Sequence, residues 1–152
     1  MLAHAYDDPV PGARVLDLFA GTGALSFEAL SRGAAYALLV DEGTEARGVI
    51  RANIEAFGAE GTTRLFRRDA TKLGPVGPGA PYGLVFCDPP YGRDLAPAAL
   101  ASAAAGGWLT RDALVVVEES GSAGVALPSG FRELERRDYG ETTVVLGRFE
   151  TA

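Results

Sequence analysis

The segment Val15-Leu16-Asp17-Leu18-Phe19-Ala20-Gly21-Thr22-Gly23 decides the fold, because an apolar run of strand length leads straight into a glycine-rich turn. A helical pattern follows, for which Thr22 is the expected N-cap and Gly33 the expected end. Glycines in such a turn allow a ligand to approach the backbone closely. In an open α/β sheet the turn lies at the carboxyl ends of the strands, where ligands bind. The segment therefore predicts the first βα unit of a sheet that carries a ligand site.

Further apolar runs of strand length alternate with segments of helical period, as expected for a parallel sheet with helices on both faces. Ala46, Ile50, Ile54 and Phe57 recur at helical spacing, and Gly58 closes that helix. The expected parallel strands are Arg14–Phe19, Ala37–Val40, Thr63–Phe66, Gly83–Cys87 and Ala113–Glu118.

The last part of the chain follows a different pattern. Phe131–Arg137 and Thr142–Phe149 are predicted to form an antiparallel hairpin around Gly140-Glu141 at the edge of the sheet. Between the fourth and fifth strands, the alanine-rich stretch Leu95–Gly107 predicts a short helix that ends at its glycine pair. Gly74–Pro81 contains too many glycines and prolines for a regular element, so it is expected to be a surface loop.

Composition predicts one globular domain over residues 1–152. The chain has 14 Lys+Arg and 20 Asp+Glu, a formal net charge of −6, and a hydrophobic fraction of 47%. A chain of this length can bury roughly 68–70% of its unfolded surface without staples. One cysteine, Cys87, and one histidine, His4, allow neither an intrachain disulfide nor a four-ligand His/Cys zinc site. We therefore expect no metal and a reducing compartment.

Membrane and secretory roles are not indicated. The longest apolar stretches, such as Ala34 to Val40, are far shorter than the roughly 18 residues of a spanning helix. The first residues have neither a basic nor an apolar signal region. The acidic balance argues against a domain that grips nucleic acid by bulk charge, although a local basic patch remains compatible with it. We expect a cytoplasmic protein.

Asp41 stands eighteen residues after Gly23, at the end of the second predicted strand, where a carboxylate can accept hydrogen bonds from ribose hydroxyls. Together, the glycine turn and Asp41 suggest a cofactor that contains a nucleoside. The alternative is that the glycines only make a tight turn and that Asp41 is a solvated loop carboxylate. Ser26 occupies the place of the third glycine of the dinucleotide fingerprint, which disfavours a pyrophosphate cofactor. Asp17, a charged residue inside an apolar strand, needs a polar partner, which an amine-bearing ligand would supply.

The fourth predicted strand ends in Asp88-Pro89-Pro90-Tyr91. Two prolines remove two N–H donors and leave carbonyl groups free to accept. A carboxylate and a proline carbonyl that face the same point would trap an NH₂ group, and a tyrosine ring offers a stacking surface for a planar base. An ordinary Asp-Pro turn with a packed surface tyrosine is the alternative.

Together, Val15–Gly23 and Asp88–Tyr91 resemble the paired motifs of class I S-adenosylmethionine-dependent methyltransferases that act on exocyclic amino groups. More narrowly, Asp17–Ala34, Asp88–Tyr91 and Gly107-Trp108-Leu109 resemble the RsmD-type methyltransferases, which modify a guanine N2 amino group of small-subunit ribosomal RNA. The resemblance implies a Rossmann-like, mostly parallel sheet of seven strands, with S-adenosyl-L-methionine as cofactor and 16S rRNA or the small ribosomal subunit as partner.

The resemblance also implies residue roles. Asp17 and the backbone around the glycine turn would hold the methionine part of the cofactor, Asp41 the ribose, and Asp69 with the Ala70 N–H the adenine; a helix N-cap is the alternative for Asp69. Asp88 and the Pro89 carbonyl would accept the two amine hydrogens of the target base, whose face Tyr91 would hold. The expected cofactor-binding residues are Asp17, Phe19, Ala20, Gly21, Thr22, Gly23, Asp41, Asp69 and Ala70, and the expected catalytic residues are Asp88, Pro89, Pro90 and Tyr91.

Two other functions share features with this prediction. A DNA adenine-N6 methyltransferase has both motifs, but 152 residues leave no room for a target-recognition segment. The second alternative is a domain that binds the cofactor but has no activity. A dehydrogenase fits poorly, because Ser26 replaces the third glycine of the dinucleotide fingerprint and Asp88–Tyr91 is not explained by it. Family members usually carry a basic segment ahead of the first strand, and this chain is expected to lack it and to act as a monomer.

The remaining positive charge falls in two groups. One contains Arg64, Arg67, Arg68 and Lys72, and the other Arg132, Arg136 and Arg137. Such runs are usually solvated surface. If one of them contacts phosphates, the binding should weaken steeply with added salt. His4 is expected at the surface and Cys87 as a small buried hydrophobic residue.

Overall fold

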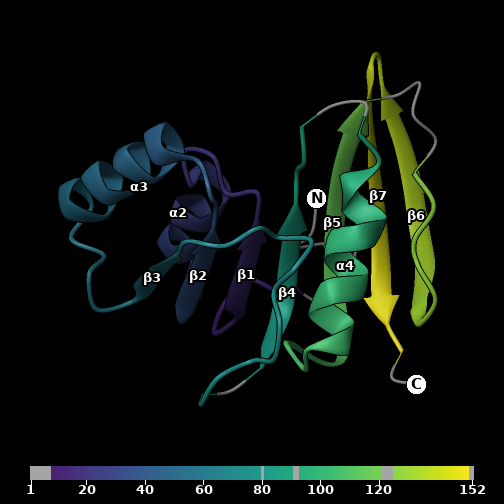
Figure 1. The fold of residues 1–152 in the computed structure, drawn as a ribbon, viewed down its shortest axis with the longest axis horizontal. Helices are drawn as coiled ribbons and strands as arrows, with labels where there is room; N and C mark the ends of the chain where they lie inside the picture. Colours follow the sequence, from purple (N-terminus) through teal and green to yellow (C-terminus); the bar gives the residue numbers. More distant parts are fainter. Residues whose placement is uncertain (1–7, 80, 91–92, 121–124, 151–152) are drawn as a thin grey trace.

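Seven strands form one mixed sheet in the order β3-β2-β1-β4-β5-β7-β6 (Figure 1). The computed structural model describes residues 8–79, 81–90, 93–120 and 125–150. Its elements are β1 (Arg14–Leu18), α2 (Ala24–Ser31), β2 (Tyr36–Val40), α3 (Thr44–Ala56), β3 (Thr63–Phe66), β4 (Tyr82–Cys87), α4 (Leu95–Ala105), β5 (Leu109–Ser120), β6 (Phe131–Tyr139) and β7 (Thr142–Phe149).

The pairing confirms the predicted mostly parallel sheet with an antiparallel hairpin at its edge. Strand β1 pairs in parallel with β2 and β4, and the parallel ladder continues from β2 to β3 and from β4 to β5. Strand β7 runs antiparallel to both β5 and β6. Only Gly140 and Glu141 separate β6 from β7, as predicted. The reversal of chain order at β1 and β4 places the ends of these two strands side by side.

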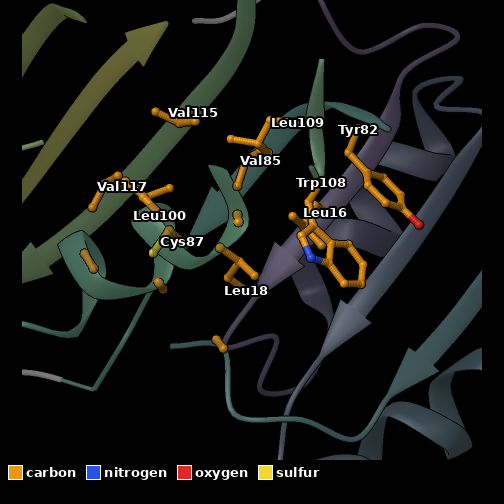
Figure 2. Packing of buried hydrophobic residues seen from close by; sticks show 14 of the residues in the cluster. Leu16, Leu18, Tyr82, Val85, Cys87, Leu100, Trp108, Leu109, Val115 and Val117 are labelled. Atoms are coloured by element: carbon orange, nitrogen blue, oxygen red, sulfur yellow. The ribbon is translucent and has the colours of Figure 1, made fainter. Parts of the chain in front are cut away.

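Alternation along the strands divides the core between the two faces of the sheet. Leu16 and Leu18 of β1 belong to one cluster, which includes the residues that α4 buries. Val15 belongs to a second cluster on the opposite face, together with Ala29 of α2 and Ile50 of α3. Figure 2 shows the first cluster, in which the side chains of β1, β4 and β5 meet Leu100 of α4 and Trp108. Helices therefore cover both faces, as predicted.

Several predicted boundaries were wrong by one to four residues. Strand β1 ends at Leu18 because Phe19 has a positive φ of 59°. The Thr22 N-cap was also wrong: Gly23 is the N-cap of α2, with φ 81°, and no side chain caps the helix. Strand β5 begins at Leu109 because it pairs with Tyr82 there, although polar residues interrupt the apolar pattern that marked only Ala113–Glu118.

In the described residues, the structure also confirms the predicted loop from Gly74 and the predicted end of the alanine-rich helix. The loop from Gly74 onward has no helix or strand in its described residues, and α4 ends directly before Gly106. Cys87 is buried, as expected, and burial raises the pKa of its thiol. His4 lies outside the described residues. No helix among the described residues is long and apolar enough to cross a membrane.

Candidate active site

A cavity of about 770 Å³ opens at the carboxyl ends of β1, β2, β3 and β4. Its volume lies within the range of pockets that hold a cofactor or a drug-sized ligand. Eight of the predicted site residues line it: Phe19, Gly21, Asp41, Asp69, Ala70, Asp88, Pro89 and Pro90. Tyr91 lies outside the described residues. Residues from distant parts of the sequence therefore meet at one edge of the sheet, as the strand order requires.

The glycine turn is shaped by its backbone. Phe19, Gly21 and Gly23 all have positive φ angles, of 59°, 62° and 81°. A Cβ atom at Gly23 would lie 2.7 Å from the ring of Phe27 and 2.8 Å from Leu39, so this glycine allows α2 to pack closely on the sheet. Gly21 instead lines the cavity, where its backbone is accessible to a ligand. The two glycines thus have different roles.

Asp41 connects the glycine turn to the loop after β2. One carboxylate oxygen accepts a hydrogen bond from the Gly21 N–H at 3.0 Å, and the other accepts from the Gly43 N–H at 2.8 Å. Each carboxylate oxygen has two lone pairs, so acceptor capacity remains for a ligand hydroxyl. The carboxylate is therefore held in position at the wall of the cavity.

Asp17 is the buried polar residue beneath the turn, and its side chain is not part of the cavity wall. Its carboxyl is 2% exposed and accepts a hydrogen bond of 2.6 Å from the Ser26 hydroxyl of α2. Burial raises the pKa of Asp17 to about 7, against the lowering effect of the Ser26 bond. Ser26, which the sequence reasoning treated only as a departure from a glycine fingerprint, is thus the partner that the buried carboxyl requires.

Asp69 shapes the turn that follows β3. One of its oxygens accepts from both the N–H and the hydroxyl of Thr71, at 2.9 and 2.7 Å, and these bonds hold the pKa of Asp69 below its usual range. No helix begins here in the described chain, so Asp69 caps a turn rather than a helix. Its second carboxylate oxygen keeps its acceptor capacity. Ala70 beside it is buried and also borders the cavity.

Asp88 follows β4 at the rim of the cavity. Withdrawal of the carboxyl from water raises the pKa of Asp88 to about 6, and the negative charges of Glu118 and Glu119 on neighbouring β5 add to this. Asp88 also borders a second cavity of about 260 Å³, on the α2 side, which Phe86, Val116 and Val144 line. The carboxylate can therefore be reached from two sides.

The structure adds two cations that sequence reasoning did not place here. Arg68 and Arg93 line the cavity together with the predicted carboxylates. Arg68 appeared in the sequence only as part of a charge run, and no pattern singled out Arg93. Their positions depend on how the loops after β3 and β4 return over the sheet edge, which no short motif encodes.

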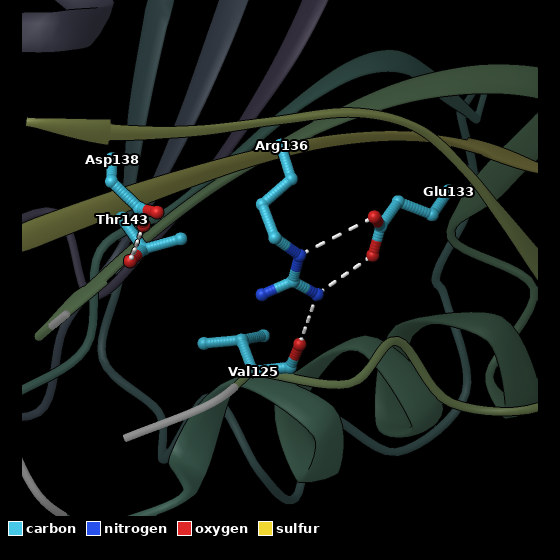
Figure 3. Close-up of polar contacts among 5 residues, drawn as sticks. All are labelled: Val125, Glu133, Arg136, Asp138 and Thr143. Carbon is cyan, nitrogen blue, oxygen red and sulfur yellow. Dashed lines mark hydrogen bonds and ion pairs between the residues drawn. The ribbon is translucent and has the colours of Figure 1, made fainter. Parts of the chain in front are cut away.

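The two predicted groups of positive charge differ in whether nearby carboxylates neutralise them. On β6, Arg136 forms an ion pair with Glu133 and donates to the carbonyl of Val125 (Figure 3). Arg132 and Arg137 are paired with Glu150 and Glu135. This group is therefore locally neutralised, whereas Arg64 and Arg68 form no ion pair with any carboxylate in the described part of the chain.

Comparison with known proteins matches the chain to one family. Residues 1–148 match the family model described as Conserved hypothetical protein 95. The chain is 37% identical over 106 residues to ribosomal RNA small subunit methyltransferase D of Escherichia coli, an alignment that covers 70% of this chain and 52% of that protein. It thus spans about half the length of that relative.

Solved structures agree with this family. The yhhF protein of Escherichia coli superposes with a TM-score of 0.85 at 29% identity, over 99% of this chain and 84% of that chain. Magnesium protoporphyrin IX methyltransferase of Synechocystis, solved with bound S-adenosylmethionine, has a TM-score of 0.68 at 18% identity, over 93% of this chain and 72% of its own, which shows the shared Rossmann-like fold. The chain therefore belongs to the Conserved hypothetical protein 95 family, the RsmD-type methyltransferases that its sequence resembles.

Proposed function

We propose that the chain transfers a methyl group from S-adenosyl-L-methionine to the exocyclic N2 amino group of a guanine in 16S rRNA of the small ribosomal subunit. Its cofactor is S-adenosylmethionine, and RNA is the substrate class to which its relative's name points. The observation that carries the proposal is the position of Asp88-Pro89-Pro90 on the rim of the same cavity as the glycine turn. A methyl donor and an amine acceptor would meet there.

The residues around the cavity fit this cofactor. Carbonyl groups of the glycine turn, with the Asp17 carboxyl beneath it, would accept hydrogen bonds from the ammonium group of the methionine moiety. Asp41, fixed by two backbone N–H groups, keeps lone pairs for the ribose hydroxyls. Asp69, fixed by Thr71, keeps an oxygen for the adenine amino group, beside the Ala70 N–H. These three positions follow the ends of β1, β2 and β3 in turn, as an extended nucleoside ligand would require.

The catalytic task of the protein is to orient the amine. The sulfonium of the cofactor makes the methyl group electrophilic. Asp88 and the Pro89 carbonyl accept the two amine hydrogens, which disfavours the planar, conjugated amine and turns the nitrogen lone pair toward the methyl group. Positioning of this kind can supply much of the rate. Tyr91 would hold the face of the base, which must be unpaired or flipped to reach the site.

The charge of Asp88 would then stabilise the positive charge that develops on nitrogen as the methyl group leaves the sulfonium, and the excess proton of the methylated amine would pass afterwards to this carboxylate or to water. Its pKa of about 6 leaves it largely ionised at neutral pH, so it can act as an acceptor without being a strong base. Rate enhancement would come from fixed electrostatics and geometry rather than from proton removal before transfer.

The test is transfer of labelled methyl from S-adenosylmethionine to small ribosomal subunits that lack the modification. Naked rRNA and DNA are assayed in parallel, and the product is identified by nucleoside analysis. Label in N2-methylguanosine is expected. Label in N6-methyladenine of DNA would replace the proposal with a DNA enzyme, and cofactor binding with no transfer to any acceptor would indicate an inactive binding domain.

Asp88→Asn is the decisive variant for the mechanism, because it keeps the shape of the side chain and removes its charge. We expect turnover to fall by about 10²–10³ with cofactor affinity changed less than about threefold. Asp112→Asn is the matched control, since Asp112 lies in β5, is exposed and lines neither of the two cavities. Near-normal turnover of Asp88→Asn would remove the charge of Asp88 from the mechanism, and near-normal turnover of Asp88→Ala would remove the side chain altogether.

A further inference from the structure

A groove of about 460 Å³ lies on the α4 side of the sheet, toward the starts of β1, β2 and β4. We call it the arginine–aromatic groove, and its principal residues are Arg14, Arg64, Arg68, Tyr36, Phe66 and Tyr82. Arg14 stands two residues before Leu16, and Tyr36 two residues before Leu38, so both side chains share the face of the α4 cluster. Among the described helices, α4 alone lies on this face, where it packs on β4 and β5. Strands β2 and β3 therefore have no described helix above them on this face.

The floor of the groove is an aromatic layer that is already in place. Trp108 packs against Phe66 and stacks on Tyr82, with ring centroids 5.8 and 6.4 Å apart. The indole N–H donates to the carbonyl of Gly74 at 2.8 Å, and the Val76 N–H donates to the carbonyl of Gly106 at 2.8 Å. These bonds fix the loop after β3 as one wall. The groove therefore requires no large rearrangement to accept a ligand.

Three guanidinium groups lie over these rings. The central carbon of the Arg14 guanidinium is 4.9 Å from the ring centroids of both Tyr36 and Tyr82. The guanidinium of Arg68 lies 4.2 Å from the centroid of Phe66, and that of Arg64 lies 5.9 Å from the same ring. A cation held on the face of a ring keeps N–H groups available for an anion at the ring edge.

The charge of the groove is of one sign. No Asp or Glu is among its described lining residues. The arginines of β6, in contrast, are each matched by a glutamate. In a chain of net charge −6, a groove with three arginines and no Asp or Glu among its described lining residues is a local exception, and Arg64 and Arg68 form no ion pair within the described part of the chain. Positive charge that is concentrated in this way attracts polyanions despite the overall acidity.

We propose that the arginine–aromatic groove binds a single-stranded segment of the RNA substrate, and this inference rests on the proposed function. Arg64 would contact a phosphate, and a base would stack on the outer face of a guanidinium group that covers the ring of Tyr36 or Phe66. Alternating aromatic and cationic side chains are the usual means of holding single strands, since every base has a π-face.

The position of Arg68 connects the two sites. Arg68 lines both the cofactor cavity and the groove, and its guanidinium donates to the carbonyl of Leu73 at 2.6 Å. The two hollows are therefore adjacent. A strand that has its target base at Asp88 could continue across the loop after β3 into the groove, which would add affinity without any change in the chemistry.

The test is the affinity of the full chain for a fluorescently labelled single-stranded RNA of roughly 15 nucleotides. Arg64→Glu is the variant, because Arg64 is exposed, lies outside the cofactor cavity and has its charge matched by no described carboxylate. Arg51→Glu is the control, because Arg51 is also an exposed arginine and lies on α3, on the opposite face of the sheet. Binding of S-adenosylmethionine reports folding of both variants.

We expect Arg64→Glu to weaken RNA binding about tenfold and Arg51→Glu less than about twofold, with cofactor binding unchanged in both. Arg64→Ala should lower the slope of log affinity against log salt by about 0.7, the value for one phosphate contact with a single strand. Equal affinities of the two charge-reversal variants would overturn the proposal. Displacement of the RNA by polyglutamate at equal charge concentration would assign the groove to an acidic protein segment and would also overturn it.

A methyl-transfer assay distinguishes failure of this inference from failure of the proposed function. If small subunits are methylated with the same KM by Arg64→Glu and the unaltered chain, the groove is not used and the proposed function stands. If RNA binding depends on Arg64 but no RNA is methylated, the groove stands and the proposed function fails.

Discussion

Replacing Asp17 with asparagine should change how the stability of the protein depends on pH. Asp17 is 2% exposed, and its burial raises its pKa from an ordinary 3.8 to about 7. Asparagine has nearly the same shape, does not titrate, and keeps an oxygen that can accept the 2.6 Å hydrogen bond from Ser26. The substitution therefore removes the titration while preserving the packing under the glycine turn.

The sign and size follow from proton linkage. Between pH about 4 and 7 the folded state holds a proton on Asp17 that the unfolded state has lost, so the free energy of unfolding decreases as the pH rises through this window. The full shift of roughly three pKa units corresponds to a loss of about 4 kcal/mol in the free energy of unfolding. The part of this loss that falls between about pH 5.5 and 8.5 is about 2 kcal/mol. The Asp17→Asn variant should lack this loss, so its stability relative to the unaltered chain should increase from the lower pH to the higher.

Urea unfolding at the two pH values, without cofactor, measures the effect. The quantity of interest is the difference in the free energy of unfolding between the Asp17→Asn variant and the unaltered chain, with Asp112→Asn as a control for loss of an exposed carboxylate. A difference that stays constant within about 0.5 kcal/mol between the two pH values would refute the reasoning. Saturating S-adenosylmethionine should reduce the pH dependence if its ammonium group approaches Asp17, because a nearby positive charge lowers the pKa of a carboxyl.

Three further outcomes are expected. Methyl transfer, measured as kcat/KM against pH, should rise as Asp88 ionises through about pH 6, and Asp88→Asn should abolish that rise. Gly23→Ala should cost about 2–4 kcal/mol in urea unfolding, because its Cβ would lie 2.7 Å from Phe27 at φ 81°; Gly140→Ala, with φ 64° and open space around it, should cost only about 1–2 kcal/mol. Trp108→Phe should lose about 1–3 kcal/mol in the same assay, since the Gly74 carbonyl loses its 2.8 Å donor; a cost below about 0.5 kcal/mol would show that this bond is unimportant.

The order of the elements was readable from local patterns, and the structure confirms it. Apolar runs such as Leu84–Cys87 are buried on both faces of a parallel sheet and stand out as continuous hydrophobic segments. Boundaries were less accurate where backbone conformation or pairing, rather than side-chain polarity, sets them. Phe19 ended β1 early through its positive φ, and pairing with β4 extended β5 back to Leu109 despite polar residues there.

For the site, the sequence alone determined the residue types and their order: a glycine turn, then carboxylates that follow successive strands. Whether Asp17 faces a ligand or a helix depended on packing, because a two-residue period cannot say which helix covers a face; α2 brought Ser26 to it. The same is true of the arginines. One run of charge was neutralised by glutamates on β6 and by Glu150, whereas Arg64 and Arg68 of the other run were gathered with aromatic rings of β2, β3 and β4 and with Trp108. Such assemblies join residues far apart in sequence, so only the tertiary structure decided them.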